Sequence, residues 1–109
     1  MRVHNVPMRV IKPSRIREFQ DAYPRAETAL GRWLELVEQN TWGSIQQLRR
    51  VFPTADAVTV RSGRTVTVFN VCGNDYRLIT AIHYNTRLVY AMQFLTHAEY
   101  DKDAWKERL

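Results

Sequence analysis

Three residues in the C-terminal half have side chains that suit chemistry on a phosphate. Arg77 lies in an otherwise apolar stretch with Leu78 and Ile79, and His97 and Tyr100 stand three residues apart beyond the last apolar run. Arg can bind a phosphate through two N–H groups. His can transfer protons near neutral pH, and Tyr can donate a hydrogen bond to a phosphoryl oxygen or stack on a base. A helical turn would place His97 and Tyr100 on one face.

The same residues also have a purely structural interpretation. A charge within an apolar strand requires a partner, and an internal ion pair of Arg77 with Asp75 or Asp101 is the interpretation that sequence alone favours. The polar segment after the last strand is explained by a capped turn, in which Thr96 is the cap and Glu99 its partner. Both interpretations stay open at the level of sequence.

The charge of the chain favours an RNA partner. The 109 residues suffice for one domain and carry a net charge of +5, with a pI near 9.8. Of the 16 basic residues, 13 are Arg, the side chain that binds phosphate bidentately and stacks on bases. A GC-rich genome would produce the same bias, so composition permits RNA binding without establishing it.

The apolar patterns predict an α+β domain in which helices pack on one face of an antiparallel sheet. Helices come first and sequential strands follow, so the strands should form a meander whose other face is free to carry function. We expect a flexible leader over residues 1–7 and a single domain over 8–109. The expected elements are a strand at 8–11, helices at 14–22 (capped by Ser14), 26–38 and from 44, strands at 57–60, 65–71, 76–83 and 87–95, and a helical tail at 103–109 capped by Asp103.

Basic residues are concentrated in the predicted sheet. Residues 49–96 contain six basic and two acidic side chains, which makes this half a candidate electropositive groove. A solvated rim is the alternative for several of these residues individually. The candidate RNA contacts are Arg49, Arg61, Arg64, Arg87 and Lys102.

Other classes of protein lack support in the sequence. Cys72 is the single cysteine, which excludes an internal disulfide, and it has no neighbouring Cys or His at metal-ligand spacing. The chain shows no P-loop, dinucleotide fingerprint or Ser-His-Asp arrangement. It also has no secretory signal and no apolar run of the ~20 residues that a membrane helix needs. We therefore expect a cytoplasmic protein without metal, cofactor or membrane partner.

Three stretches resemble the HigB toxins of the RelE-like superfamily, which belong to type II toxin–antitoxin systems. Residues 48–56 are similar to the pattern Leu-Lys/Arg-x-x-Phe-Pro-x-x-Asp of that family. Residues 68–79 are similar to its hairpin Val-Phe-Asn-x-x-Gly-Asn-x-Tyr-Arg-Leu, and residues 96–102 to its ending Thr-His-x-Glu-Tyr-Asp. The resemblance covers about residues 8–106, with the motifs in the same order and at the same spacing.

The resemblance implies a RelE-like fold and a ribosome-dependent endoribonuclease that cleaves messenger RNA and needs no metal. It implies a HigA-type helix-turn-helix antitoxin as partner, with DNA contacted only through the antitoxin complex. By the same resemblance, Arg77 holds the scissile phosphate, His97 transfers a proton, and Tyr100 orients the substrate or stacks on a base. The chain departs from the family at Thr65 and Val66, where relatives often have a basic residue; Arg64 is the nearest one here.

Two other classes of function are compatible with these residues. The basic sheet could bind RNA or protein without cleaving anything, or the chain could be an inactive relative kept for antitoxin binding. Loss of cleavage with intact binding in variants of Arg77 and His97 supports the enzyme. Absence of cleavage by the unaltered protein on translating ribosomes supports the binding module.

Overall fold

The computed structural model describes residues 6–109 of the chain. Most of the predicted leader, residues 1–5, lies outside the described residues. From Val6 onward the described chain is hydrogen-bonded to the segment that follows α2. The Thr41 hydroxyl donates to the Val6 carbonyl at 2.8 Å, and the Met8 N–H donates to the Asn40 carbonyl at 2.8 Å. Met8 is almost fully buried. No helix of residues 6–109 is long and apolar enough to cross a membrane.

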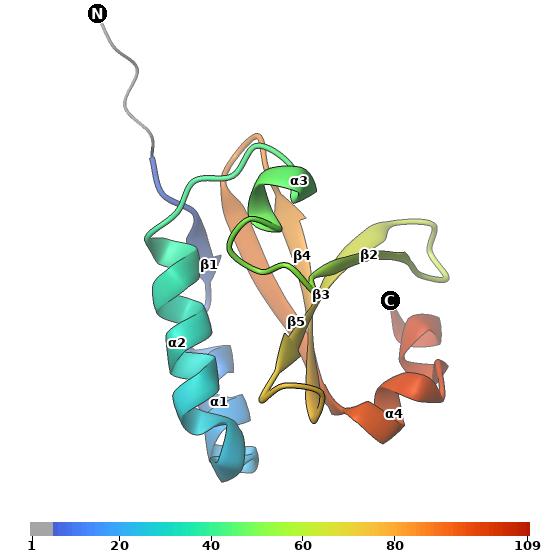
Figure 1. Ribbon diagram of the computed structural model, residues 1–109. Coiled ribbons are helices and arrows are strands. Elements are labelled where there is room, and N and C mark those ends of the chain that lie inside the picture. Colours follow the sequence, from blue (N-terminus) through green and yellow to red (C-terminus); the bar gives the residue numbers. More distant parts are fainter. Residues whose placement is uncertain (1–5) are drawn as a thin grey trace, which may run out of the picture.

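Helices precede most of the sheet along the chain, as the apolar patterns predict (Figure 1). The strands are β1 (Arg9–Ile11), β2 (Asp56–Thr59), β3 (Thr65–Val71), β4 (Tyr76–His83) and β5 (Leu88–Thr96). The α-helices are α1 (Ser14–Ala22), α2 (Glu27–Glu38), α3 (Ile45–Leu48) and α4 (His97–Asp101), and two short 3-10 helices are η1 (Pro24–Ala26) and η2 (Ala104–Arg108).

The five strands form one sheet in the order β1-β5-β4-β3-β2. Strands β2 to β5 are the predicted antiparallel meander, whereas β1 lies parallel to β5 with Val10 opposite Val89. The predicted α+β class is confirmed, and the sheet is mixed rather than wholly antiparallel. The parallel edge arises because the chain leaves β1, builds its helices and hairpins, and returns beside it at the end.

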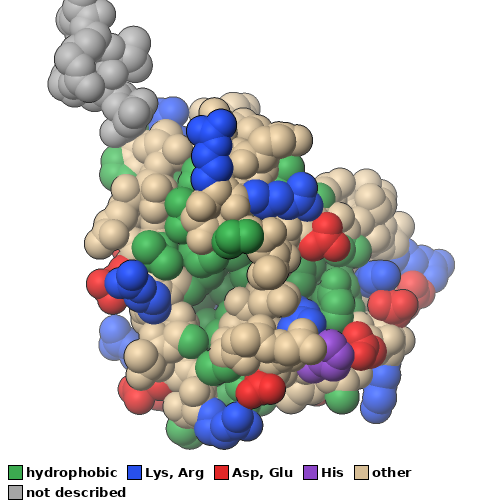
Figure 2. Space-filling model, viewed as in Figure 1, with side chains coloured by type: hydrophobic (Ala, Val, Ile, Leu, Met, Phe, Trp, Pro, Cys, Tyr) green, Lys and Arg blue, Asp and Glu red, His purple; other side chains and the backbone are tan. Residues whose placement is uncertain are grey.

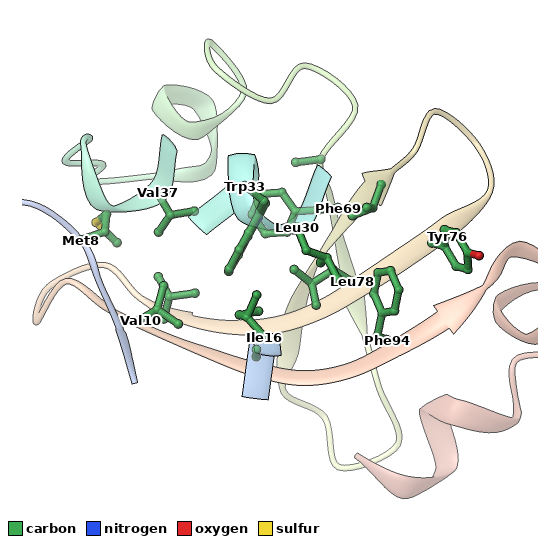
Figure 3. Close-up of a cluster of buried hydrophobic side chains, with 14 of the residues drawn as sticks. Met8, Val10, Ile16, Leu30, Trp33, Val37, Phe69, Tyr76, Leu78 and Phe94 are labelled. Atoms are coloured by element: carbon green, nitrogen blue, oxygen red, sulfur yellow. The ribbon is translucent and has the colours of Figure 1, made fainter. Parts of the chain in front are cut away.

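The main core fills the space between the helices and the first face of the sheet (Figure 3). Helix α2 contributes Leu30, Trp33 and Val37, which recur at helical spacing and are at most 3% exposed. Phe69 and Leu78 of the sheet lie against them, and the Trp33 and Phe69 rings meet edge to face at 5.5 Å. This packing makes β3 and β4 a rigid support for whatever their second face carries.

The second face is only partly free, contrary to our prediction. After β5 the chain turns through α4 and lays η2 across this face, where Trp105 is 1% exposed. Trp105 packs in a second apolar cluster with Val66, Val68 and Ile79 among others. A row of apolar residues on the second face would otherwise contact water, so the C-terminal segment covers it. The consequence is that functional groups on this face lie beside the C-terminal segment.

Two predicted helix caps are wrong. Pro13 already has helical backbone angles, so Ser14 is the first residue of α1 and makes no capping bond. Asp103 precedes η2 with a left-handed φ of 61°. Its carboxylate forms an ion pair with Lys106 at 3.2 Å and accepts no hydrogen bond from a backbone N–H of η2. Ser44 does cap α3, since its hydroxyl accepts from the Gln47 N–H.

Candidate functional site

Arg77 is a nearly buried cation on the second face of β4, with only 7% of its surface exposed. One guanidinium nitrogen donates to the Asn74 and Tyr76 carbonyls at 3.1 and 3.0 Å. The other donates to the Asn74 side-chain oxygen at 2.6 Å and lies 2.9 Å from Nδ1 of His97. The tight turn between β3 and β4 therefore positions the guanidinium by bringing Asn74 back over it.

No carboxylate neutralises Arg77 among residues 6–109. Asp75 instead pairs with Arg25 at 3.0 Å, and Asp101 lies 2.9 Å from Nε2 of His97. The internal ion pair that sequence alone favoured is therefore wrong. Asp75 belongs to the turn and points outward, and Asp101 is drawn to the histidine one helical turn before it. Among the described residues the positive charge is therefore held by neutral acceptors alone.

His97 is oriented at both of its ring nitrogens. A guanidinium has only donors, so Nδ1 must accept from Arg77, and Nε2 carries the proton and donates to Asp101. The backbone is equally well held, because Thr96 and Glu99 form the predicted capping box of α4 and the His97 N–H donates to the Asp75 carbonyl at 2.9 Å. The imidazole thus presents one basic nitrogen toward the guanidinium.

Tyr100 completes the cluster from the next turn of α4. The guanidinium carbon of Arg77 lies 5.4 Å from the centre of its ring, and the Trp105 ring stacks on it at 5.2 Å. Burial raises the pKa of Tyr100 above its usual value of 10.0, and the nearby Asp56 carboxylate raises it further. The phenol therefore stays protonated near neutral pH and can donate a hydrogen bond.

The structure thus brings together the three predicted catalytic residues and adds Asn74 and Asp101, which the sequence analysis did not name as site residues. Asn74 holds the guanidinium, and Asp101 orients the histidine. Asn70 lies directly across the β3–β4 ladder from Arg77, and it is exposed. The spacing of His97 and Asp101, four residues apart on a helix, was a signal that could have identified the pair. Both asparagines are fixed positions of the hairpin pattern that residues 68–79 resemble, and that pattern was the signal for them.

The predicted RNA contacts do not form one group. Arg49 pairs with Asp56 at 3.4 Å, and Arg61 pairs with Glu107 at 2.6 Å. The remaining three form no ion pair within residues 6–109: Lys102 is exposed at the end of α4, Arg87 lies in the β4–β5 turn, and Arg64 lies on the β2–β3 hairpin. Their contacts with RNA stay predictions.

The face shown in Figure 2 carries no single basic patch, because Lys and Arg side chains alternate there with Asp and Glu. Hydrophobic side chains line a hollow near the middle of this face. A cavity of about 150 Å³ lies here between α2 and the end of β3, with Trp33, Leu36 and Phe52 in its wall. Another cavity, of about 520 Å³, does not include Arg77 in its lining.

The capping box of α4 yields a stability prediction. Thr96→Ala removes the hydroxyl that accepts from the Glu99 N–H at 3.2 Å, and we expect the free energy of unfolding to fall by about 1 kcal/mol. Denaturant unfolding of the purified protein measures this change. Thr96→Ser keeps the cap and should unfold like the unaltered protein. Equal losses in both variants would show that the methyl group, not the cap, matters.

Comparison with known proteins finds relatives that match most of the chain. The family model described as "HigB_toxin, RelE-like toxic component of a toxin-antitoxin system" matches residues 26–103. The "mRNA interferase toxin HigB" of Escherichia coli (strain K12) is 26% identical over 94 residues, covering 86% of this chain and 88% of that protein. The "mRNA interferase HigB" of Shigella flexneri is similar to the same extent. The residues that the family model matches include the β3–β4 turn and α4.

Proposed function

Because this chain belongs to the HigB toxin family, the RelE-like toxic components of toxin–antitoxin systems, we propose that it is an endoribonuclease that cleaves messenger RNA. In this proposal it acts on translating ribosomes in the cytoplasm, needs no metal, and stops translation. A HigA-type helix-turn-helix antitoxin inhibits it and provides any contact with DNA. The relatives named as mRNA interferases support the substrate and the reaction.

One observation carries the proposal: Arg77 is a nearly buried cation without a carboxylate partner in the described chain, beside His97 and Tyr100. Burying a charge is costly, and here only neutral acceptors offset the cost. An RNA phosphate competes well with those acceptors, since it carries the opposite charge and can accept two parallel N–H bonds from a guanidinium. In our proposal the scissile phosphate takes the place of the Asn74 side-chain oxygen.

The reaction that fits these groups uses the nucleophile of RNA itself. The 2′-oxygen attacks the adjacent phosphorus, the P–O5′ bond breaks, and the products are a 2′,3′-cyclic phosphate and a 5′-hydroxyl. The protein has to align the groups, neutralise the charge that develops on the phosphoryl oxygens, and transfer one proton from the 2′-oxygen and one to the 5′-oxygen. Arg77 supplies the positive charge, because a guanidinium is too weak an acid and base for proton transfer.

His97 is the proton-transfer group in this proposal. Its Nδ1 carries a lone pair and faces the guanidinium that would hold the phosphate. When the phosphate binds, we expect the guanidinium to turn its N–H from Nδ1 to the phosphate, so that this lone pair can accept the 2′-hydroxyl proton. Asp101 on Nε2 then stabilises the imidazolium that results. Tyr100 orients the phosphate through its hydroxyl rather than by base stacking, since Arg77 and Trp105 already lie against its ring.

The experiment that tests this function is induction of the chain in cells without an antitoxin. We expect growth arrest and new 5′-hydroxyl ends inside translated messages, mapped by sequencing of RNA 5′ ends. The Arg77→Ala variant, expressed to the same soluble level, provides the control and should produce neither effect. Normal growth of cells that contain the soluble unaltered protein, without new RNA ends, would contradict the proposal and leave a binding module as the better interpretation.

A further inference from the structure

An open groove of about 520 Å³ lies on the second face of the sheet, away from Arg77. Strands β1, β4 and β5 form its floor with small and apolar residues such as Ala81 and Met92. Lys12, at the end of β1, and Arg64, on the β2–β3 hairpin, lie on its rim. Leu109 of the C-terminal segment completes the wall.

Three cations and no carboxylate side chain line this groove in the described part of the chain: Lys12, Arg15 and Arg64. The guanidinium of Arg15 is fixed, because it donates to the Met92 carbonyl at the irregular point of the β4–β5 ladder and lies 5.4 Å from the centre of the Phe19 ring. Lys12 and Arg64 are exposed and form no ion pair within residues 6–109. Such a rim attracts a polyanion.

The groove also contains an aromatic side chain that faces solvent. Tyr90 is 38% exposed, and the described residues include just one other exposed large hydrophobic side chain, Val6. The His83 ring meets Tyr90 edge to face, with centroids 5.4 Å apart at 81°. This contact leaves part of the Tyr90 ring exposed to solvent. Ala81, the ladder partner of Tyr90, is small and leaves room beside it. A nucleobase can stack on such a ring irrespective of its sequence.

The groove and the Arg77 site lie on the same face of the sheet. Arg77 and His83 are six residues apart on β4, so their side chains point to the same side and stand about 20 Å apart along the strand. Leu109 packs on the apolar cluster that contains Trp105 and also lines the groove. The C-terminal segment therefore lies between the groove and the Arg77 site. An extended single strand that crosses this segment connects them.

We propose that this groove holds a second stretch of the single-stranded message, several nucleotides from the cleaved bond. Lys12 and Arg64 bind its phosphates, and one base stacks on Tyr90. The inference rests on the proposed function, because it places the remainder of the same substrate. Cations without carboxylate side chains among the described residues, together with an open aromatic ring, favour RNA over a protein partner, whose docking would call for a mainly apolar or mixed-charge surface.

The experiment is equilibrium binding of a fluorescent single-stranded RNA of about twelve nucleotides, measured by anisotropy at several salt concentrations. All its riboses are 2′-O-methylated, so it lacks the attacking hydroxyl and cannot be cleaved.

Tyr90→Ala should weaken binding about 5- to 150-fold, and Tyr90→Phe, which keeps the ring, should bind as the unaltered protein. The double variant Lys12→Ala/Arg64→Ala should lower the salt slope by about 0.7 for each phosphate that is no longer neutralised. Arg17→Ala, an exposed cation of α1 outside the groove, is the matched control and should change neither quantity.

The proposal is overturned if the unaltered protein fails to bind this RNA at low salt, or if the groove variants bind it as the unaltered protein does. Variants that keep full RNA affinity but no longer co-purify with the antitoxin would assign the groove to the antitoxin instead. Cleavage of unmodified message on ribosomes is measured separately. Its absence in the unaltered protein contradicts the proposed function, whereas intact cleavage with unchanged RNA affinity in the groove variants contradicts the groove alone.

Discussion

Replacing Arg77 with alanine is expected to slow single-turnover cleavage on a programmed ribosome by about 100- to 1,000-fold, as removal of one oxyanion donor does in other enzymes. The guanidinium is the nearly buried positive charge of the site, and in the described chain only neutral groups accept its hydrogen bonds. Its interaction with the phosphate strengthens as charge develops in the transition state. The loss should therefore appear in the rate of the chemical step rather than in ribosome binding.

Two further variants separate chemistry from folding. Arg50→Ala removes an exposed arginine that follows α3 and should cleave at the unaltered rate. Arg77→Lys keeps the charge but loses the planar fork that reaches both Asn74 and His97, so it should recover only part of the activity. Each variant is checked by thermal melting. Equal rates for Arg77→Ala and Arg50→Ala, with both proteins folded, would remove Arg77 from the site.

Replacing His97 with alanine is expected to lower the same rate by about 100- to 10,000-fold, the usual contribution of a positioned acid or base. The substitution should leave the fold intact, because His97 is the first residue of α4, its side chain is partly exposed, and the cap belongs to Thr96 and Glu99. The measurement is single-turnover cleavage with thermal melting of the same preparation. Cleavage at the unaltered rate would reduce His97 to a structural neighbour of Arg77.

Asp101 offers a milder version of the same test. Asp101→Asn keeps the size of the side chain but removes the charge that faces Nε2 of His97 at 2.9 Å. We expect a smaller loss than for His97→Ala, of up to about 100-fold, since the imidazole is misoriented rather than removed. Asp103→Asn alters a neighbouring carboxylate that pairs with Lys106 and should have no effect on cleavage. A loss in both variants alike would indicate a general charge effect.

Local patterns predicted the strands that carry the site almost to the residue. Alternating apolar residues and the Gly-Asn turn predicted strands at 65–71 and 76–83, and these are the bounds of β3 and β4. Strands β2 and β5 are displaced by one residue from their predicted starts and ends. The short helix predicted from residue 44 is α3 at Ile45–Leu48, and the residues between it and Pro53 continue mostly as turns.

The sequence by itself determined the α+β class, the strands and turns of the meander, and the three residues Arg77, His97 and Tyr100 as candidates, because all of these depend on local patterns. Only the tertiary structure decided that β1 lies parallel beside β5 and that the C-terminal segment covers part of the second face. It also decided the surroundings of Arg77, since Asp75 and Asp101, the two partners that the sequence suggested, pair with other side chains. Such choices depend on how distant segments bury apolar surface together, and no short window of sequence contains that information.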